Sequence, residues 1–158
     1  MRLHSGFLLC CMAPLVHAQG PAVTASDWGG IGLLQTPTAR MAEAGEVAFT
    51  LSKTSPYVRY NFTLQPFDWL EGGFRYIDIT NRKYDPNASI SDGSQSLKDK
   101  SIDVKFRIVK ESRHVPQVAV GLRDLGGTGK FAGEYVVASK RWGAVDASLG
   151  LGWGYVGR

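Results

Sequence analysis

The strongest constraint on the fold is the alternation of apolar and polar residues in the stretch IDVKFRIV, residues 102–109. Ile102, Val104, Phe106 and Ile108 fall on one parity, and the charged residues between them fall on the other. A period of two predicts a β-strand with one apolar face and one wet face. Two surroundings fit this pattern: the core of a soluble sandwich against the apolar face, or the lipid around an outer-membrane barrel.

Similar alternation recurs along the sequence from residue 45 onward. It predicts strands at 47–51, 57–65, 70–77, 102–109, 118–123, 134–140 and 145–155. Extended into their flanks, most of these segments reach about nine to eleven residues, the length of a tilted membrane-crossing strand. Soluble sheets use shorter strands. We therefore expect an all-β fold, an antiparallel outer-membrane β-barrel segment of about seven strands.

Two features of this pattern leave points open. In the segment 134–140, Tyr135 and Val137 share one parity while Val136 and Ala138 share the other, so either pair is a candidate for the outer face. Seven strands also fall short of the even number, at least eight, that closes a bacterial barrel. The sequence therefore predicts an incomplete barrel, either the N-terminal fragment of a longer protein or a truncated open reading frame.

The connections between the predicted strands differ in length. The polar segment 79–98 and the segment 124–133 are long, whereas 66–68 and 142–144 are tight. Bacterial barrels alternate short periplasmic turns with longer external loops. This comparison predicts that 79–98 lies at the cell surface, although the short turn at 53–56 departs from the rule.

The sequence begins with a basic residue, an apolar run and a small-residue cleavage site ending at Ala18. This order predicts a cleaved signal peptide over 1–18. Cys10 and Cys11 both lie inside it and lack the small residues that precede a lipoprotein cysteine, so we expect cleavage without lipidation. Residues 19–44 then form a glycine-rich lead-in with a short helical turn at 39–44, and 45–158 form the partial barrel.

The charge and the motifs exclude several functions. The chain has 18 basic and 14 acidic residues, a scattered excess too weak to indicate nucleic-acid binding. The stretch GGTGK at 126–130 lacks the first glycine and the hydroxyl residue of a phosphate loop. His114 has no nucleophile motif near it, and no metal-ligand spacing occurs. We therefore expect no catalytic residues, metal or cofactor.

In a barrel, the charged parity of the strands would face the lumen. This assignment gives five basic and three acidic candidates, a mildly cationic wall suited to acidic glycans. The lumen-facing candidates are Arg59, Glu71, Arg75, Asp103, Lys105, Arg107, Arg123 and Asp146. If the lumen is aqueous, Lys105 and Arg107 stand in water, and reversing their charge has little effect on folding.

Several separated blocks carry a resemblance to a known family. They are WGGIGLLQTPTARMA with the following Gly45-Glu46, then GLRD at 121–124, GEY at 133–135, ASKRWG at 138–143 and LGLGWG at 149–154. Together they resemble the YjbH family of exopolysaccharide-biosynthesis outer-membrane proteins, over nearly the whole mature chain. The resemblance implies a large, non-enzymatic barrel protein involved in the biosynthesis or export of extracellular polysaccharide, without known catalytic residues.

The resemblance also implies a location and partners. We expect an outer-membrane protein that contacts lipid, an acidic exopolysaccharide and polysaccharide-export proteins, and no nucleic acid. Two alternatives stay open: a general porin-like barrel, and a soluble periplasmic β-sandwich binding module. Membrane extraction separates the soluble module from the barrels, and glycan secretion separates the two barrels.

Overall fold

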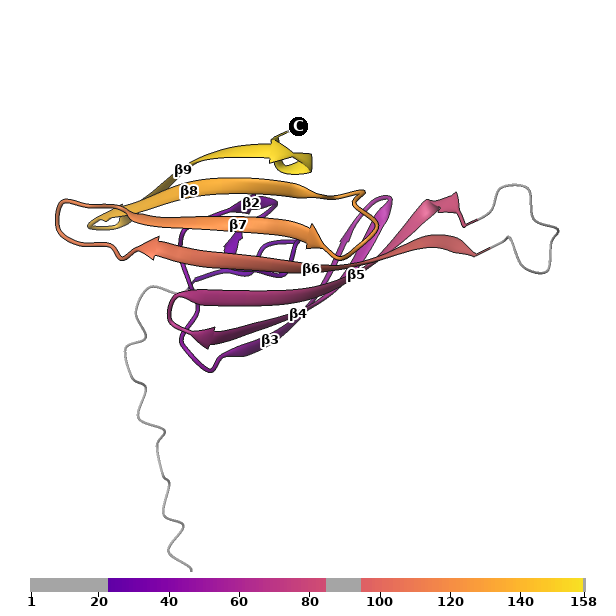
Figure 1. Cartoon of the computed structure of the whole chain (residues 1–158), viewed down its shortest axis with the longest axis horizontal. Coiled ribbons are helices and arrows are strands. Elements are labelled where there is room, and N and C mark those ends of the chain that lie inside the picture. The colour runs from indigo at the N-terminus through magenta and orange to yellow at the C-terminus, as the bar shows by residue number, and fades with distance from the viewer. Residues whose placement is uncertain (1–22, 85–94, 158) are drawn as a thin grey trace, which may run out of the picture.

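A computed structural model describes residues 23–84 and 95–157. The predicted signal peptide and the middle of the predicted surface loop lie outside these residues. The described chain contains two short strands and one antiparallel sheet of seven strands, in which each strand pairs with its neighbours in the sequence (Figure 1). The seven are β3 (Val47–Thr54), β4 (Tyr57–Phe67), β5 (Leu70–Lys83), β6 (Ser96–Val109), β7 (Gln117–Leu125), β8 (Gly133–Trp142) and β9 (Val145–Gly154).

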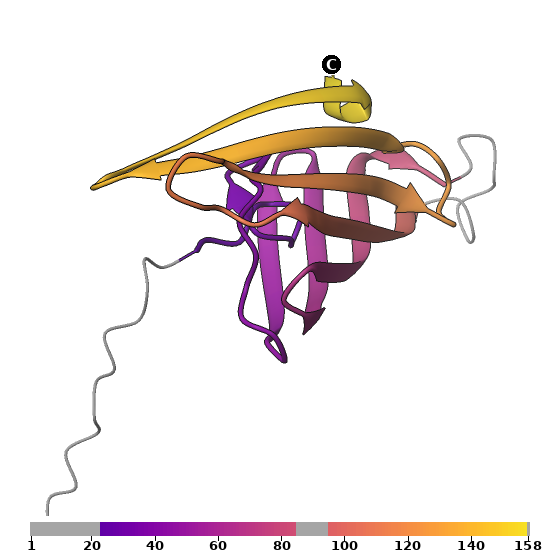
Figure 2. The ribbon, with the colours of Figure 1, turned by 60° about the vertical axis from the view of Figure 1, so that its left-hand side comes forward.

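The sheet curls into a half-barrel, with β3 and β9 at its two edges (Figure 2). The prediction of an all-β, barrel-like segment of about seven antiparallel strands is therefore confirmed. In the described ranges the chain has no α-helix, and its one helical element is the short 3₁₀ turn η1 (Tyr155–Gly157) after β9.

The longest strands are β5 and β6, of 14 residues each. They pair beyond the ends that alternation predicted, because residues 78–79 pair with 97–98 and, after an irregularity, Lys83 pairs with Ser96. The long connection predicted at 79–98 is therefore wrong in its bounds. The hydrogen-bonded arms project from the rest of the sheet (Figure 1), and residues 85–94 lie outside the described ranges.

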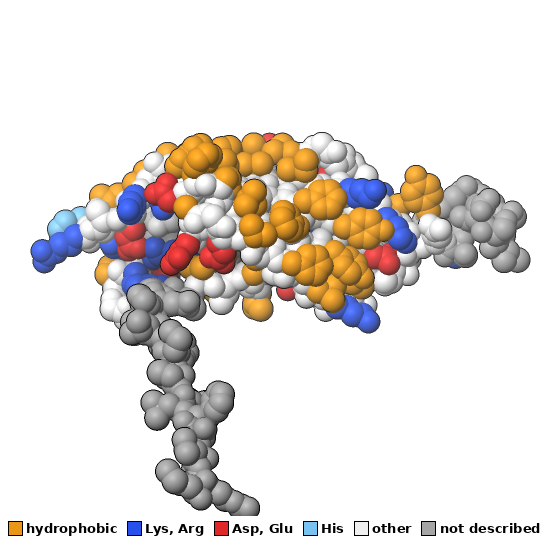
Figure 3. All heavy atoms as spheres, turned by 90° about the horizontal axis from the view of Figure 1, so that it is seen from below, with side chains coloured by type: hydrophobic (Ala, Val, Ile, Leu, Met, Phe, Trp, Pro, Cys, Tyr) orange, Lys and Arg blue, Asp and Glu red, His pale blue; other side chains and the backbone are white. Residues whose placement is uncertain are grey.

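The two faces of the sheet differ in chemistry. Large apolar side chains stand exposed on the convex face, among them Phe49, Phe62, Phe74, Leu149 and Leu151. Figure 3 shows the molecule from below, with hydrophobic side chains gathered across the middle of the visible face and charged side chains toward its ends. The alternation left the facing of 134–140 open, and the structure decides it. Tyr135 and Val137 are buried on the concave side, and Val136 is exposed.

The lead-in lies inside the curve of the half-barrel (Figures 1 and 2). It contains the short pair β1 (Gly32–Leu33) and β2 (Thr36–Pro37). The helical turn predicted at 39–44 is wrong, because side chains of the sheet bind the backbone of Ala39 instead. Its N–H donates to Ser139 Oγ at 2.9 Å, and its carbonyl accepts a bond from Gln117 Nε2 at 2.5 Å.

Candidate functional site

All eight predicted lumen-facing residues lie on the concave side, on strands β4 to β9. Five of them are buried: Arg59 and Arg75 at 1% exposure, Lys105 at 2%, Glu71 at 7% and Arg123 at 8%. The strand period places them there, since alternate residues of a strand share one face. The other three, Asp103, Arg107 and Asp146, are partly exposed.

The expectation that Lys105 stands in an aqueous lumen is wrong. Its ammonium lies 2.9 Å from Glu71 Oε2 and donates to the carbonyls of Ile31 and Arg40 at 3.1 and 2.9 Å. The physical reason is that the lead-in fills the concave side and displaces water from it. A buried lysine keeps its charge only if partners replace its hydration, and here one carboxylate and two carbonyls do so.

The glycines of the lead-in allow its backbone to approach the sheet closely. The N–H of Ile31 donates to Glu71 Oε2 at 3.1 Å. A Cβ added to Gly30 would meet Glu71 Oε1 at 2.3 Å, and one added to Gly29 would meet the Cβ of Asn61 at 2.5 Å. Gly29 also has a φ of +94°, in the region that favours glycine. The glycine pair therefore serves close packing rather than nucleotide binding.

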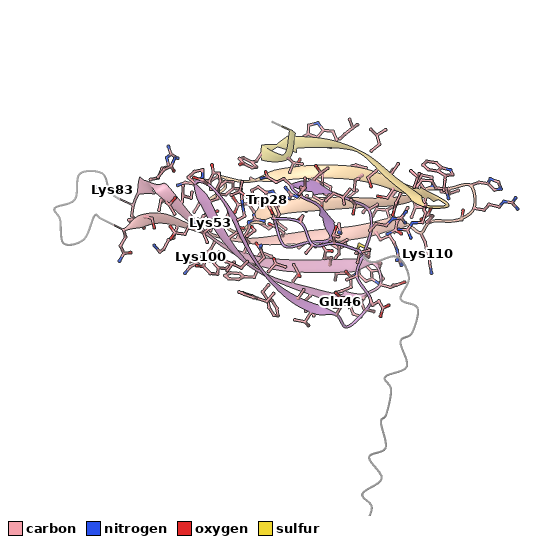
Figure 4. All side chains as sticks on the ribbon, turned by 180° about the vertical axis from the view of Figure 1, so that it is seen from behind. Trp28, Glu46, Lys53, Lys83, Lys100 and Lys110 are labelled. Carbon is pink, nitrogen blue, oxygen red and sulfur yellow. The ribbon has the colours of Figure 1, made fainter. Side chains whose placement is uncertain are left out.

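Trp28 is the centre of the concave side. It is 4% exposed, and Figure 4 shows it within the curve of the sheet. The guanidinium carbons of three arginines lie close to its ring centroid: Arg59 at 4.7 Å, Arg75 at 4.6 Å and Arg123 at 4.9 Å. A cation within about 6 Å of an indole ring is attracted by its π electrons. We call these three residues the arginine triad.

Aromatic side chains complete the surroundings of Trp28. Phe131 and Tyr155 meet its ring edge-on, with centroids at 5.6 and 5.4 Å. Ile77 and Ile79 of β5 join Trp28 and Phe131 in one buried cluster. The lead-in is thus held by apolar packing at the same point where it meets the arginines.

The arginine triad has more N–H donors than partners. Arg75 pairs with Asp103, but its Nε and Nη2 are buried without a hydrogen bond, and so are Nε and Nη1 of Arg59. Within the described ranges, Arg59 and Arg123 form no salt bridge. The triad therefore carries a concentration of positive charge with few partners, and buried cations without partners are costly.

A second group of charges binds the lead-in outside the triad. Arg40 contacts Glu111 at 2.5 Å and Asp146 at 2.6 Å. Lys140 also contacts Glu111, at 3.1 Å, and Arg141 contacts Asp146 at 2.7 Å. We call these five residues the Arg40 network. It joins the lead-in to β8, β9 and the segment after β6.

Glu111 has the clearest electrostatic shift in the Arg40 network. Desolvation acts to raise the pKa of this carboxyl, but the backbone N–H of Arg141 and the side chains of Arg40 and Lys140 outweigh it. They hold the pKa of Glu111 at about 2. Desolvation acts to lower the pKa of Arg40, but the carboxylates of Asp146 and Glu111 outweigh it and raise this pKa. Glu111 and Arg40 are therefore both charged at neutral pH.

The lead-in contacts were not predicted from the sequence. Trp28 and Arg40 lie in a segment without periodicity, and nothing in their spacing indicates a partner. Ser139 lies in the predicted strand 134–140, whose facing was left open, and Gln117 directly precedes the predicted strand 118–123; both are buried polar residues on the concave side. Alternation identified eight charged members of the concave face but missed the uncharged ones and the buried Asp99 of β6.

Within residues 23–84 and 95–157, no helix is long and apolar enough to cross a membrane, and no group of three or more His, Cys, Asp or Glu side chains is placed to hold a metal ion. The fold and the site define a class, a half-barrel whose charged concave side is filled by a segment of its own chain.

The family follows from comparison with known proteins. Residues 24–158 match a family model, YjbH, described as "Exopolysaccharide biosynthesis protein YbjH", and the chain belongs to this family. It is 53% identical over 132 residues to a protein of Escherichia coli strain K12 named "Uncharacterized lipoprotein YjbH". The match covers 84% of this chain and 19% of that relative, so the chain spans about a fifth of the relative's length. No solved structure matches.

Proposed function

We propose that this chain is a non-enzymatic segment of an outer-membrane β-barrel that serves the biosynthesis or export of an exopolysaccharide. The family supports the link to the polysaccharide. One observation carries the barrel: the convex face exposes large apolar side chains such as Phe49 at 68%, Leu149 at 82% and Leu151 at 70%. A contiguous apolar face of this kind marks contact with a membrane or a protein.

In this proposal, lipid covers the convex face and the charged face turns inward. The edges β3 and β9 each pair on one side only within the described chain. Lipid tolerates no open sheet edge, so further strands must close the barrel. The E. coli relative is about five times longer than the matched region, which is consistent with additional strands in a longer polypeptide.

The proposal places the protein in the outer membrane after export. The name of the E. coli relative contains the word lipoprotein, which supports a location in the cell envelope. Our sequence prediction differs in one respect, because it expects cleavage at Ala18 rather than a lipid on Cys10 or Cys11; these residues lie outside the described ranges. Mass spectrometry of the mature N-terminus decides between the two.

Membrane extraction and polymer secretion test the proposal together. Carbonate or high salt should leave the protein in the membrane fraction, and a deletion strain should secrete less polysaccharide until the gene is restored. Extraction by carbonate would favour the soluble sandwich and overturn the barrel. Normal secretion by the deletion strain, with the protein still in the membrane, would favour the porin-like alternative.

A further inference from the structure

The arginine triad is the least compensated charge on the concave side. Lys105 and Arg107 each have a carboxylate partner, whereas Arg59 and Arg123 have none among the described residues. The π electrons of Trp28 offset part of the cost, but an indole ring accepts no conventional hydrogen bond from the buried N–H groups. An anion bound at the triad would compensate part of this charge.

Arg123 also lines a cavity large enough for a ligand. This cavity measures about 430 Å³ and lies between the lead-in and strands β8 and β9. Its polar lining includes Gln35, Tyr135, Ser148 and Tyr155. Binding sites for small molecules begin at about 300 Å³, so one or two sugar rings fit.

A second, smaller cavity lies beside this space and borders the triad. It measures about 30 Å³, and its charged lining consists of Arg75, Lys105 and Arg123 together with the carboxylates Glu71 and Asp103. The two cavities share Trp28, Pro37, Arg123 and Tyr135 as walls. Arg123 is therefore the member of the triad that an acidic group in the larger cavity can reach, and Arg75 and Arg59 lie beside the same Trp28 ring.

The geometry points to a binding site for a carboxylate-bearing sugar residue, with the carboxylate on Arg123 and the ring in the larger cavity. A planar guanidinium binds a carboxylate through two parallel hydrogen bonds. The hydroxyl and amide groups of Tyr135, Ser148 and Gln35 supply partners for the sugar hydroxyls. The choice of a sugar rests on the proposed function, whereas the preference for an anion rests on the cavity and the triad alone.

Calorimetric titration of the 158-residue chain in detergent micelles tests this inference. The probes are digalacturonate, the neutral disaccharide of galactose, and acetate as a free carboxylate. We expect digalacturonate to bind at least about tenfold more tightly than the neutral sugar or acetate, since charge-assisted and sugar contacts are both needed. Equal binding of the two disaccharides would overturn the site, and acetate binding as tightly as digalacturonate would overturn its sugar specificity.

A matched pair of variants locates the site. Arg123→Gln should weaken digalacturonate binding at least about tenfold, whereas Arg107→Gln, on the same face but outside both cavities, should leave it unchanged. Arg123→Lys keeps the charge and should bind with intermediate strength, which keeps the test open if Arg123→Gln fails to fold. Full binding by the folded Arg123→Gln or Arg123→Lys protein would overturn the assignment.

The outcome is distinguishable from a failure of the proposed function. Lack of digalacturonate binding together with a secretion defect in the deletion strain would remove the binding site and leave the function in place. Tight digalacturonate binding without a secretion defect in the deletion strain would keep the binding site and remove the proposed function. A digalacturonate-dependent rise in the unfolding temperature of the unsubstituted chain gives a second measure of binding.

Discussion

The concave and convex faces of the same sheet have opposite relations between polarity and burial. On the concave face, the most deeply buried large side chains are Arg59, Arg75 and Lys105. On the convex face, Phe49 and Leu149 are among the most exposed. In a water-soluble sandwich the apolar face would be the covered one. The difference teaches that burial here follows the position of the lead-in rather than hydrophobicity.

The same contrast shows what holds each face in place. Buried charges depend on a particular partner, because each one that loses its partner is left without water as well. The free energy of an exposed apolar side chain depends instead on the surrounding medium, because contact with water is unfavourable and contact with an apolar medium is not. Substitutions of buried charges on the concave face and of apolar residues on the convex face therefore test this difference directly.

The largest effect is expected at the buried pair of Lys105 and Glu71. Lys105→Ala removes the ammonium and leaves the Glu71 carboxylate buried beside the lead-in, which should lower the free energy of unfolding by about 3–5 kcal/mol. Urea unfolding in detergent micelles measures this. Replacing both residues by leucine should restore most of the loss, and an equally unstable double variant would show that the pair is not the cause.

A smaller effect is expected on the convex face. Phe74 lies in β5 and is 47% exposed. Phe74→Arg should cost about 2–4 kcal/mol if lipid covers this position, and Thr80→Arg, toward the end of the same strand, only about 0–1 kcal/mol. Unfolding from lipid bilayers measures both. No cost at Phe74 would place this face in water and contradict the proposed lipid contact.

The Arg40 network gives a pH dependence. The pKa of Glu111 is about 2 in the folded protein, below its usual 4.5. A depressed carboxyl pKa contributes stability above pH 4.5 that is lost as the pH falls toward 2. After allowance for solvent screening, we expect a loss of about 2 kcal/mol over this range. Glu111→Gln should flatten the pH dependence, and an unchanged slope would assign it to other carboxyls.

The smallest effect is expected at Arg107, which has the same parity and strand as Lys105. Its guanidinium lies 2.5 Å from Asp68, whose side chain is 63% exposed. Pairs that reach solvent contribute little, so Arg107→Ala should cost about 0–1 kcal/mol in the same unfolding experiment. A loss as large as that of Lys105→Ala would mean that burial does not govern the charges of this face.

Periodicity predicted the strands of the sheet well, but it did not predict that the lead-in fills the concave side. The seven strands and the facing of Arg59, Arg75 and Lys105 follow from alternation, which depends only on local backbone geometry. The facing of β8 did not follow, because Tyr135 and Val136 are both apolar. The filled concave side was missed, because the contacts of Trp28 join a segment without periodicity to strands far along the chain. Such contacts leave no local pattern.

The distances along the chain between the lead-in and its partners have a consequence for how the molecule assembles. Ala39 bonds to Ser139 across 100 positions, and Arg40 bonds to Asp146 across 106. These partners exist only once β8 and β9 have formed, and contacts of such separation are slow to close. The part of the described chain that is synthesised first therefore reaches its final place only after β8 and β9 have formed.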